Sequence, residues 1–170
     1  SGSDYVDEYY NNQRDLSQAA RISITTNSTV NNINAQLEVG GKIKGRVTDP
    51  AGKAVADVYV YADATTPNTS GLAYTDANGY YTITRLLADD YTVLFLPPSK
   101  TELAREYYNN QHDFNQAQPI AVDFGTLTTG IDAQLEVGGK ITGRVINKAG
   151  AGVKNIDIRL QDNINSFATN

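Results

Sequence analysis

The sequence repeats itself at a fixed spacing of 98 residues. Glu8-Tyr-Tyr-Asn-Asn-Gln13 recurs as Glu106-Tyr-Tyr-Asn-Asn-Gln111, and Ala35–Ile43 recurs unchanged as Ala133–Ile141. Aligned at this offset without gaps, 56 consecutive positions contain 26 identities. Self-similarity at a fixed period is the signature of a chain built from repeated structural units. The 170 residues therefore hold about one and three-quarter copies of one module. The fold must be one that neighbouring copies can each adopt.

Two glycine pairs mark where one copy of the module ends and the next begins. Gly40-Gly41 and Gly138-Gly139 interrupt an apolar alternation that continues on both sides of each pair. We therefore expect one complete module at 41–138. Residues 1–40 are then the C-terminal part of a preceding repeat, and residues 139–170 are the N-terminal part of a following repeat.

Apolar and polar residues alternate along several short stretches, which predicts β-strands. From Lys42 to Val47 every second residue is basic, and the residues between them are apolar or glycine. This period of two places one face of the strand in a core. Asp57–Ala62 alternates in the same way. Turn-forming residues separate such stretches at intervals of roughly 8–12 residues. This spacing is typical of a β-sandwich or barrel.

Further strands are expected at Tyr80–Thr84, Tyr91–Leu96, Pro119–Asp123 and Ile131–Val137. The one expected helix is Lys100–Tyr108, which Ser99 would cap. The residues expected in the core of the module are Ile43, Val47, Val58, Val60, Ile83, Val93 and Ile131.

Composition excludes several kinds of chemistry. The net charge is −5, and binding to nucleic acid requires a basic surface, so we expect no nucleic-acid partner. The chain has no cysteine and one histidine, which excludes Cys-based zinc sites and multi-histidine metal centres. No stretch approaches the ~18 consecutive apolar residues of a membrane span, so we expect no membrane insertion.

Four segments follow one another in an order typical of a known family. They are Gly45-Arg-Val-Thr-Asp-Pro-Ala-Gly52, Val55-Ala-Asp-Val-Tyr-Val60, Thr75-Asp-Ala-Asn-Gly-Tyr-Tyr-Thr-Ile83 and Tyr91-Thr-Val93. Over residues 41–96 the chain resembles the carboxypeptidase regulatory-like domain, which has a transthyretin-like (prealbumin-like) fold. The resemblance implies an all-β, antiparallel Greek-key-type β-sandwich of about seven strands, here in tandem 98-residue repeats. The Glu-Tyr-Tyr-Asn-Asn segment resembles connectors in tandem arrays of such domains on bacterial surface proteins.

The resemblance implies no peptidase activity. A zinc carboxypeptidase holds its metal with two histidines and a glutamate, whereas this chain has His112 alone. In that family the regulatory-like domain is the non-catalytic accessory. His112 occupies the position of Arg14 in the first copy, so we interpret it as a solvated polar position. We expect no catalytic and no cofactor-binding residues, and hence no enzyme.

One loop carries oxygen atoms of the kind that calcium prefers. In Asp76-Ala-Asn-Gly79 the calcium candidates are Asp76 and Asn78. A calcium ion takes about six to eight oxygen ligands, so other loops would have to contribute the rest. The favoured interpretation is a hairpin turn in which Asn78 and Gly79 supply positive φ.

Two acceptor patterns for N-glycosylation are present, Asn27-Ser-Thr29 and Asn68-Thr-Ser70. Three-residue matches of this kind arise easily by chance in a chain rich in Asn and Thr. Asn27 and Asn68 are therefore candidates only.

Tyrosines are concentrated on one predicted strand and in the connectors. Tyr59 and Tyr61 lie on the polar face of a strand, and Tyr107 and Tyr108 lie in the repeated connector. Exposed rings stack on sugars or form protein contacts, whereas cross-strand packing also places tyrosines on sheets. Both interpretations stay open. The alternative function is a carbohydrate-binding accessory module that uses exposed tyrosines, with glycans as partners.

The two incomplete modules carry apolar faces that need partners. Residues 1–40, the first flank, correspond to the last strands of the module, and residues 139–170, the second flank, correspond to its first strands. Each flank therefore lacks the strands that the other one contains. Unpaired edges and apolar faces invite strand addition from another chain. Head-to-tail contact of this kind propagates as a filament unless it closes into a ring. The predicted assembly interface consists of Ile22, Ile24, Ile33, Leu37, Ile141, Val145, Ile156 and Ile158.

The predicted function is structural or adhesive, at the cell surface or in the secreted space. The partners are further copies of the chain, joined head to tail, or neighbouring repeats. Ala73–Pro98 has no second copy, so two flanks together lack a counterpart of this segment. A longer array of repeats would also explain why the sequence contains two incomplete modules. The two-residue connection at Gly138-Gly139 predicts stiff joints between modules.

Overall fold

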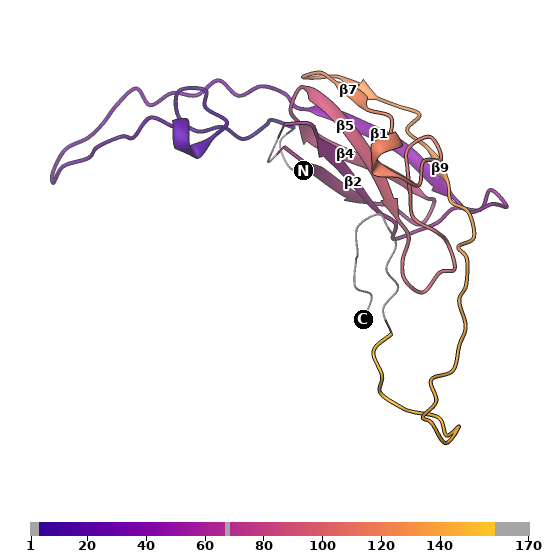
Figure 1. Ribbon diagram of the computed structural model, residues 1–170. Helices are drawn as coiled ribbons and strands as arrows, with labels where there is room; N and C mark the ends of the chain where they lie inside the picture. Colours follow the sequence, from indigo (N-terminus) through magenta and orange to yellow (C-terminus); the bar gives the residue numbers. More distant parts are fainter. Residues whose placement is uncertain (1–3, 67–68, 159–170) are drawn as a thin grey trace. The chain divides into compact units, whose positions relative to one another are not determined.

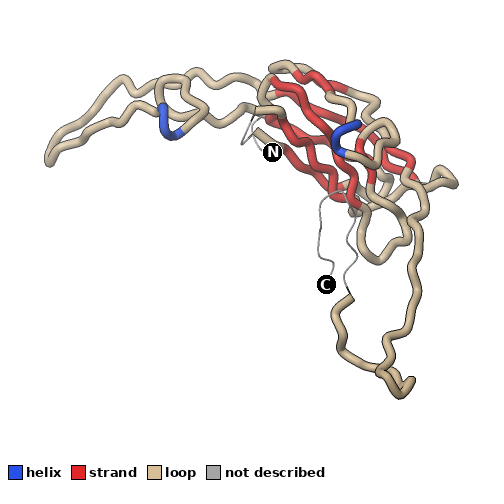
Figure 2. The backbone as a smooth tube through the Cα atoms, viewed as in Figure 1, coloured by secondary structure: helices blue, strands red, loops and turns tan. Residues whose placement is uncertain are grey.

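The computed structural model describes residues 4–66 and 69–158. The chain divides into two compact units, Ser1–Val137 and Gly138–Asn170, which are described separately. All described strands lie in the first unit, where they form two sheets (Figures 1 and 2). They are β1 (Gly41–Thr48), β2 (Tyr59–Ala64), β3 (Gly71–Tyr74), β4 (Tyr80–Leu86), β5 (Asp89–Leu96), β6 (Glu106–Tyr107), β7 (Ile120–Val122), β8 (Leu127–Thr128) and β9 (Ala133–Gln134).

The two sheets pack as a β-sandwich, which confirms the predicted fold class. One sheet has the order β4-β1-β8, with β9 also paired to β1. The other has the order β3-β2-β5-β6, with β7 also paired to β5. Two short 3₁₀ turns, η1 (Leu16–Gln18) and η2 (Phe114–Gln116), are the helical elements of the described residues. Among these residues no helix has the length and hydropathy of a membrane span.

The strand that opens the module departs from the expected antiparallel arrangement. β1 runs parallel to β8, with Lys42 opposite Leu127, and parallel to β9, with Val47 opposite Ala133. The remaining strand pairs are antiparallel. Parallel neighbours require a long crossover connection, and the chain between β1 and β8 includes every strand of the second sheet. This long connection allows the chain to return to β1 in the same direction.

The core lies between the sheets and contains the residues that the alternation predicted. In β1, Ile43 and Val47 are fully buried and Lys44 is exposed, so the predicted register of this strand is confirmed. All seven residues expected in the core are buried. They join Tyr81, Tyr91, Phe95 and Leu135 in one cluster.

A close contact between β1 and the segment before β9 explains Gly45. A Cβ atom at this position would overlap the carbonyl oxygen of Ile131. The hydroxyl of Tyr81 donates to the same carbonyl at 2.7 Å. Burial, together with the charge of Asp132, raises the pKa of the Tyr81 phenol, so this group stays protonated and able to donate. Because Gly45 has no side chain, the backbone at Ile131 can approach β1 closely.

The expected helix at Lys100–Tyr108 is wrong. Glu106–Tyr107 forms β6 instead, with Tyr107 opposite Leu94 of β5 and Glu106 opposite Phe95. The hydrogen-bonding edge of β5 outweighs the weak local preference for a helix, because tertiary context routinely overrides propensity. The expected strand at Ile131–Val137 is also shorter, since its ladder is limited to Ala133–Gln134.

The Glu-Tyr-Tyr-Asn-Asn-Gln segment adopts the same turn in both copies. The backbone N–H of Tyr9 donates to the carbonyl of Gln13 at 2.8 Å, and that of Tyr107 donates to Gln111 at 2.6 Å. The two asparagines of each copy have φ values between 55° and 67°, a left-handed region that asparagine tolerates well. A 3₁₀ turn capped by an aspartate side chain follows in each copy.

The described part of the second unit, residues 138–158, reproduces one loop of the complete module. The Asn147 side chain accepts from the backbone N–H groups of Ala149 and Ala151 at 3.0 Å. In the first unit the equivalent Asp49 carboxylate accepts two backbone N–H groups at 2.9 Å. The described residues of the second unit form an isolated bridge between Ile146 and Gly152 but no strand.

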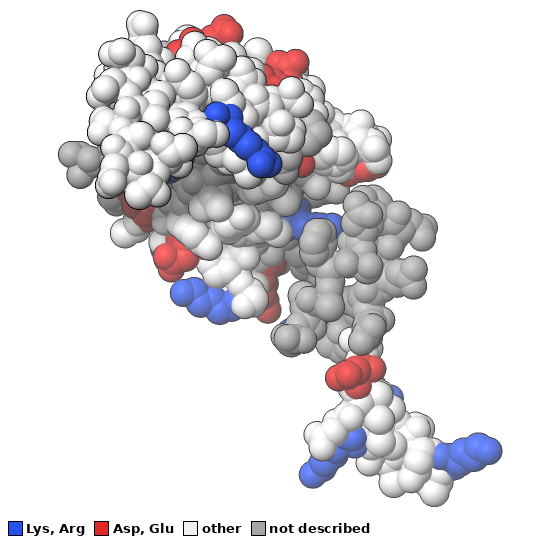
Figure 3. Space-filling view, turned by 90° about the vertical axis from the view of Figure 1, so that its left-hand side faces the viewer, with Lys and Arg blue, Asp and Glu red and all other residues white. Residues whose placement is uncertain are grey.

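On the face drawn in Figure 3, the basic (blue) and acidic (red) side chains of the sandwich are spread among uncharged ones.

We expect Ile43→Ala to lower the free energy of unfolding by about 2–5 kcal/mol, because it removes a fully buried side chain from β1. Lys44→Ala, one residue along the same strand, should change it by less than about 0.5 kcal/mol. Urea unfolding of both variants measures the difference. Equal destabilisation would place the register of β1 one residue away from the observed one.

Candidate functional site at the junction between repeats

The junction before the complete module is a packed element built around Gly40 and Gly41. Residues 4–6 run beside residues 38–40, and the backbone N–H of Val6 donates to the carbonyl of Glu38 at 2.9 Å. The N–H of Gly40 donates to the carbonyl of Asp4 at 2.8 Å. The Val6 side chain is 2% exposed. The chain thus enters β1 from a segment that hydrogen bonds and the buried Val6 hold in place.

Both glycines at this junction are required by close packing. A Cβ atom on Gly40 would lie 2.5 Å from Cα of Arg85 and 2.9 Å from Val6. A Cβ atom on Gly41 would collide with the side chain of Val122 and lie 2.7 Å from the carbonyl oxygen of Asp123. Because the backbone and side chains of β4 and β7 touch the glycine pair, the joint has little room to bend.

Ion pairs add to the junction at its surface. Lys42 Nζ lies 2.8 Å from Asp4, and Arg85 lies 4.0 Å from Asp7. These side chains are partly exposed, so each pair contributes little, on the order of 0–1 kcal/mol. They orient the segment before the module, whereas the backbone hydrogen bonds and the buried Val6 hold it.

A cluster of charged residues follows the first connector. Arg14 lies 3.2 Å from Glu38 and 3.7 Å from Glu8, and its guanidinium also donates to the carbonyl of Asp7 at 2.7 Å. The guanidinium stands 6.0 Å above the ring of Phe124. Arg14 therefore ties the first Glu-Tyr-Tyr-Asn-Asn-Gln segment to Glu38 and to the ring of Phe124 after β7.

The second connector carries the same cluster with one substitution. Glu106 and Glu136 take the places of Glu8 and Glu38, and His112 takes the place of Arg14. His112 Nε2 lies 3.9 Å from Glu136, and the Glu106 side chain is buried beneath the connector with the residue 1% exposed. Burial raises the pKa of Glu106, an effect that the charge of His112 opposes and that of Glu136 reinforces.

Sequence analysis missed this cluster. His112 was interpreted as a solvated position, and its side chain is exposed, but it faces a carboxylate. The signal was available, because all three charged positions recur at the 98-residue spacing.

The residues predicted for the assembly interface are exposed or half-buried in the chain. Each flank therefore presents apolar side chains that the complete module buries at the equivalent positions. Ile22, Ile24, Ile33 and Leu37 of the first flank and Ile141, Ile156 and Ile158 of the second are exposed, and Val145 is half-buried.

The tyrosine candidates divide into two groups on the second sheet. Tyr59 and Tyr61 are neighbours on β2 with ring centres 6.2 Å apart, and Tyr74 of β3 meets Tyr59 edge-on at 5.3 Å. Tyr107 packs edge-on against the ring of Phe114 at 5.9 Å. Tyr108 packs against the core. The connector tyrosines are thus engaged in packing, whereas the first group forms an aromatic cluster on the outer face.

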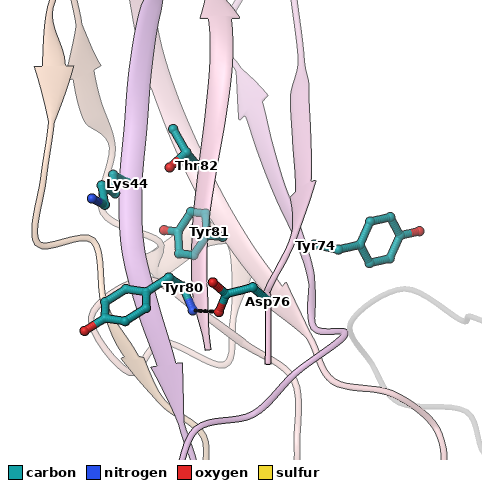
Figure 4. A pocket seen from close by; sticks show the side chains of 6 residues that line it. All are labelled: Lys44, Tyr74, Asp76, Tyr80, Tyr81 and Thr82. Atoms are coloured by element: carbon teal, nitrogen blue, oxygen red, sulfur yellow. Dashed lines mark hydrogen bonds between the residues drawn. The ribbon is translucent and has the colours of Figure 1, made fainter. Parts of the chain in front are cut away.

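The loop with the calcium candidates lies beside a shallow surface hollow. Asp76 accepts from the backbone N–H groups of Asn78 at 2.8 Å and Tyr80 at 2.9 Å, which fixes the turn between β3 and β4. Because β3 and β4 belong to different sheets, this turn is not the expected hairpin. Gly79 has a positive φ of 78°, as expected, and Asn78 does not, contrary to expectation. In Figure 4 Tyr74 points away from the other lining residues. The hollow is lined by Lys44, Tyr74, Asp76, Tyr80, Tyr81 and Thr82.

No group of three or more His, Asp or Glu side chains within residues 4–66 and 69–158 is placed to hold a metal ion. Calcium binding at Asp76 and Asn78 stays a prediction, as does glycosylation. Asn27 lies in an exposed turn with φ of 61°. Asn68 lies outside the described residues.

Comparison of the sequence with models of protein families identifies the type of domain that follows this junction. The profile of the carboxypeptidase regulatory-like domain matches residues 42–124, from β1 to the loop after β7. This segment matches the family model of the carboxypeptidase regulatory-like domain. The resemblance carried by the segments between Gly45 and Val93 is thereby confirmed. The domain type is a non-catalytic regulatory or structural fold. The match ends before β8 and β9, so the strands that close on β1 follow the regulatory-like domain in the chain.

One similar solved structure is the Bacillus anthracis TIE protein, with a TM-score of 0.43 and 15% sequence identity. The similarity covers 57% of this chain and 16% of that chain, so it spans a small part of the other protein's length. A comparison with curated proteins found no match.

The two glycine pairs offer a matched test of the junction in the regulatory-like module. Gly41→Ala should lower the free energy of unfolding by about 1–3 kcal/mol, because its Cβ atom collides with Val122 and Asp123. Gly139→Ala, at the equivalent position of the next repeat, should be nearly neutral in dilute protein, since nothing lies within 4 Å of its Cβ position. Thermal or urea unfolding measures both. Similar effects at both positions would mean that close packing does not explain the glycines.

Proposed function

We propose that this protein is a non-enzymatic, extracellular structural or adhesive repeat protein. Its β-sandwiches join head to tail into a filament or a rigid array at the cell surface. One observation carries the proposal: the complete module closes by pairing its first strand with its last segment, and each flank carries one half of that pairing without a partner. The completing strand is supplied by a neighbouring copy or repeat.

The internal pairing serves as a template for the contact between copies. In the complete module Val47 lies opposite Ala133, and Thr48 lies opposite Gln134. The 98-residue spacing transfers this register to the flanks: Val145 lies opposite Ala35, and Ile146 opposite Gln36, of a neighbouring copy. Both flanks keep the residues that this register requires, because Val, Ala and Gln recur unchanged and Thr becomes Ile.

Two further features of the template are present in the flanks. Gly45 admits the carbonyl of Ile131, and the equivalent Gly143 has no atom within 4 Å of its Cβ position, which leaves room for the carbonyl of Ile33. The backbone N–H of Arg46 donates to Asp132 Oδ1 at 2.7 Å. At the position equivalent to Asp132 the first flank has an asparagine, whose side-chain oxygen can accept in the same way.

The energetic drive is the burial of apolar side chains that the flanks expose. Each fully buried aliphatic side chain is worth about 1.5–3 kcal/mol relative to an exposed one. Counterparts of β4 and β5 occur in neither flank, because Ala73–Pro98 has no second copy. Two flanks alone therefore bury less than a complete module, and association between separate chains is expected to depend on concentration. Whole neighbouring repeats would make the same contacts and bury more.

The junction geometry supports a stiff assembly. The glycine pair at 40–41 is enclosed by Val6, Arg85 and Val122, and hydrogen bonds fix the segment on either side. A short connection that cannot bend fixes the orientation of one module relative to the next. Rigid strings of sandwiches suit a role in projecting or building structures at a cell surface, with further copies or repeats as partners.

Cysteine cross-linking tests the register directly, since the chain contains no cysteine. Gln36→Cys and Ile146→Cys proteins, mixed under mild oxidation, should form a disulfide-linked heterodimer, because paired strand positions fall within disulfide distance. The matched control replaces Gln36→Cys with Ser17→Cys, which is exposed in η1 and outside the paired stretch. Equal yields from the two mixtures would contradict the register.

A deletion tests the assembly itself. Removing residues 1–38 should abolish association in light scattering, whereas residues 41–137 stay folded because the core cluster lies within them. Assembly equal to that of the full chain, or a full chain that stays monomeric at every concentration, would overturn the head-to-tail proposal.

Glycan binding is the second candidate function, favoured by the aromatic cluster of Tyr59, Tyr61 and Tyr74. In the next repeat the first two positions are aspartate and arginine, so the fold of the repeat does not require aromatic residues there. Exposed rings of this kind can stack on sugar faces. Tyr59 and Tyr61 are therefore not kept as aromatic residues in the second copy.

Retention on insoluble polysaccharides tests this function. Tyr59→Ala and Tyr61→Ala should each release the protein, because they remove stacking rings. Tyr80→Ala is the control, since Tyr80 is exposed but lies on β4 in the other sheet, where its ring stacks with Arg46. Retention unchanged in all three variants, or no retention of the unaltered protein, would exclude glycan binding by these rings.

A further inference from the structure

The first flank repeats the segment that closes the complete module. Residues 102–138, here called the closing segment, supply β6, β7, β8 and β9. Residues 4–40 are the equivalent of the closing segment at the 98-residue spacing. In both segments a backbone bridge joins the two ends, between Tyr5 and Val39 in the first flank and between the equivalent residues in the closing segment. Each segment is therefore a loop that is closed at its base.

The turns of the two segments also agree residue by residue. The backbone N–H of Ser28 donates to the carbonyl of Thr25 at 3.1 Å, and that of Thr126 donates to the carbonyl of Asp123 at 3.2 Å. In each turn the hydroxyl of the donor residue also donates to the same carbonyl, at 2.8 Å in the first flank and 2.7 Å in the closing segment. The two turns lie 98 residues apart and have the same hydrogen bonds.

The left-handed backbone positions of the two segments agree as well. Asn27 has φ of 61° where the equivalent Gly125 has 67°, and Asn32 has φ of 63° where Gly130 has 77°. Asparagine tolerates this region of backbone conformation better than most residues other than glycine. The first flank thus has the shape of the closing segment, although none of its described residues belongs to a strand.

The first flank exposes the apolar side chains that the closing segment buries. Ile24 is 71% exposed and the equivalent Val122 is 2% exposed, while Leu37 is 42% exposed and the equivalent Leu135 is fully buried. Two further isoleucines of the flank differ from their equivalents in the same direction. A segment that already has its bound shape loses less conformational entropy when it binds. The first flank is therefore suited to complete a sandwich whose closing segment is missing.

The module that follows the flank in the same chain is out of its reach. In the complete module Gln134 lies opposite Thr48, and β9 runs parallel to β1, so Gln36 would have to lie opposite Thr48. Gly41 lies ~23 Å from Thr48 along β1, at about 3.3 Å per residue. The stretch from Gln36 to Gly41 spans at most ~18 Å when fully extended. The acceptor is therefore a second copy of the module.

We propose that residues 4–40 are a spare closing segment, which completes the sandwich of a second copy at β1 and β5 when that copy's own closing segment is displaced. The register of the complete module places Ala35 opposite Val47 of the acceptor and Ile22 opposite Tyr91. The inference rests on strand completion in the proposed function but not on pairing between two flanks. Its acceptor has both β1 and β5, and the second flank has no counterpart of β5.

In the unaltered chain the closing segment keeps its place because it is tethered to the module that it completes. A tethered segment acts at an effective concentration in roughly the millimolar range, above that of the free protein in an ordinary solution. Displacement by a second copy therefore becomes measurable when the closing segment is weakened. Because displacement joins two chains, it increases with protein concentration.

Urea unfolding of full-length variants over a range of protein concentrations tests the inference. Leu135→Asp puts a charge in place of a fully buried side chain and so disables the closing segment. Its urea midpoint should rise by about 0.3–1 M for each tenfold increase in protein concentration, because a second copy supplies its first flank. Adding Leu37→Asp should remove this dependence. Leu37→Asp alone should leave the midpoint unchanged, since Leu37 is exposed.

Val93→Asp is the matched control. Val93 is fully buried on β5 and belongs to the stretch without a second copy, so no other segment of the chain can replace it. Its midpoint should not depend on protein concentration. Leu135→Ala is a milder variant with the same expectation as Leu135→Asp, and it keeps the test usable if the charged variant unfolds at every concentration. A midpoint of Leu135→Ala that is independent of concentration, or a dependence that survives Leu37→Asp, would overturn the proposal.

Cross-linking identifies the acceptor strand. A Gln36→Cys chain mixed with a chain that carries Thr48→Cys and Leu135→Ala should form a mixed disulfide, because Gln36 takes the place of the residue paired with Thr48. Ser17→Cys in place of Gln36→Cys is the control, and equal yields from the two mixtures would contradict closure by the first flank. The earlier cross-link from Gln36 to Ile146 reports on pairing between two flanks, so either proposal can fail without the other.

Discussion

The closure of β1 between β4 on one side and β8 and β9 on the other is the constraint on which the module depends. β1 is the first strand of the module, and the strands that close it come from the module's end, so neither end is complete without the other. The contact is close enough that only glycine fits at position 45, where Ile131 presents its carbonyl and Tyr81 donates to it. β8 and β9 run parallel to β1, and the chain between them contains every strand of the second sheet, which provides the long crossover that parallel neighbours require.

The closure of β1 also explains the exposed apolar faces of the flanks and the packing of the glycine pair. A module that closes by joining its two ends leaves a cut copy with exposed apolar faces, as at Ile24 and Ile141. The glycine pair that begins β1 is packed against β4 and β7, so closure also fixes the segment that arrives from the preceding repeat. Closure of one module and the stiffness of the junction before it thus arise from the same few contacts. This coupling supports the proposed structural role in a chain of sandwiches.

Different parts of the site differed in how far sequence could predict them. The junction could be located at Gly40-Gly41 by its place in the repeat, but the reason for glycine was not visible. Neither glycine has the positive φ that sequence reasoning usually associates with this residue; the neighbours Arg85 and Val122 exclude a side chain. The cluster around His112 was missed because its glutamates lie 6 and 24 residues away along the chain, and tertiary packing brings them together. The aromatic cluster was partly predicted, since Tyr59 and Tyr61 share one strand face and Tyr74 joins them from β3.

By itself, the sequence determined the all-β class, the period of 98 residues and the inner face of each main strand. These are encoded locally, because a strand that buries one face must alternate, as Lys42–Val47 does, and a repeated fold must repeat its core positions. The tertiary structure alone decided that residues 106–107 form a strand rather than part of a helix, and that β8 and β9 run parallel to β1. Both depend on hydrogen-bonding edges offered by strands distant in sequence, and the partner at such an edge outweighs the weak preferences of a two-residue segment.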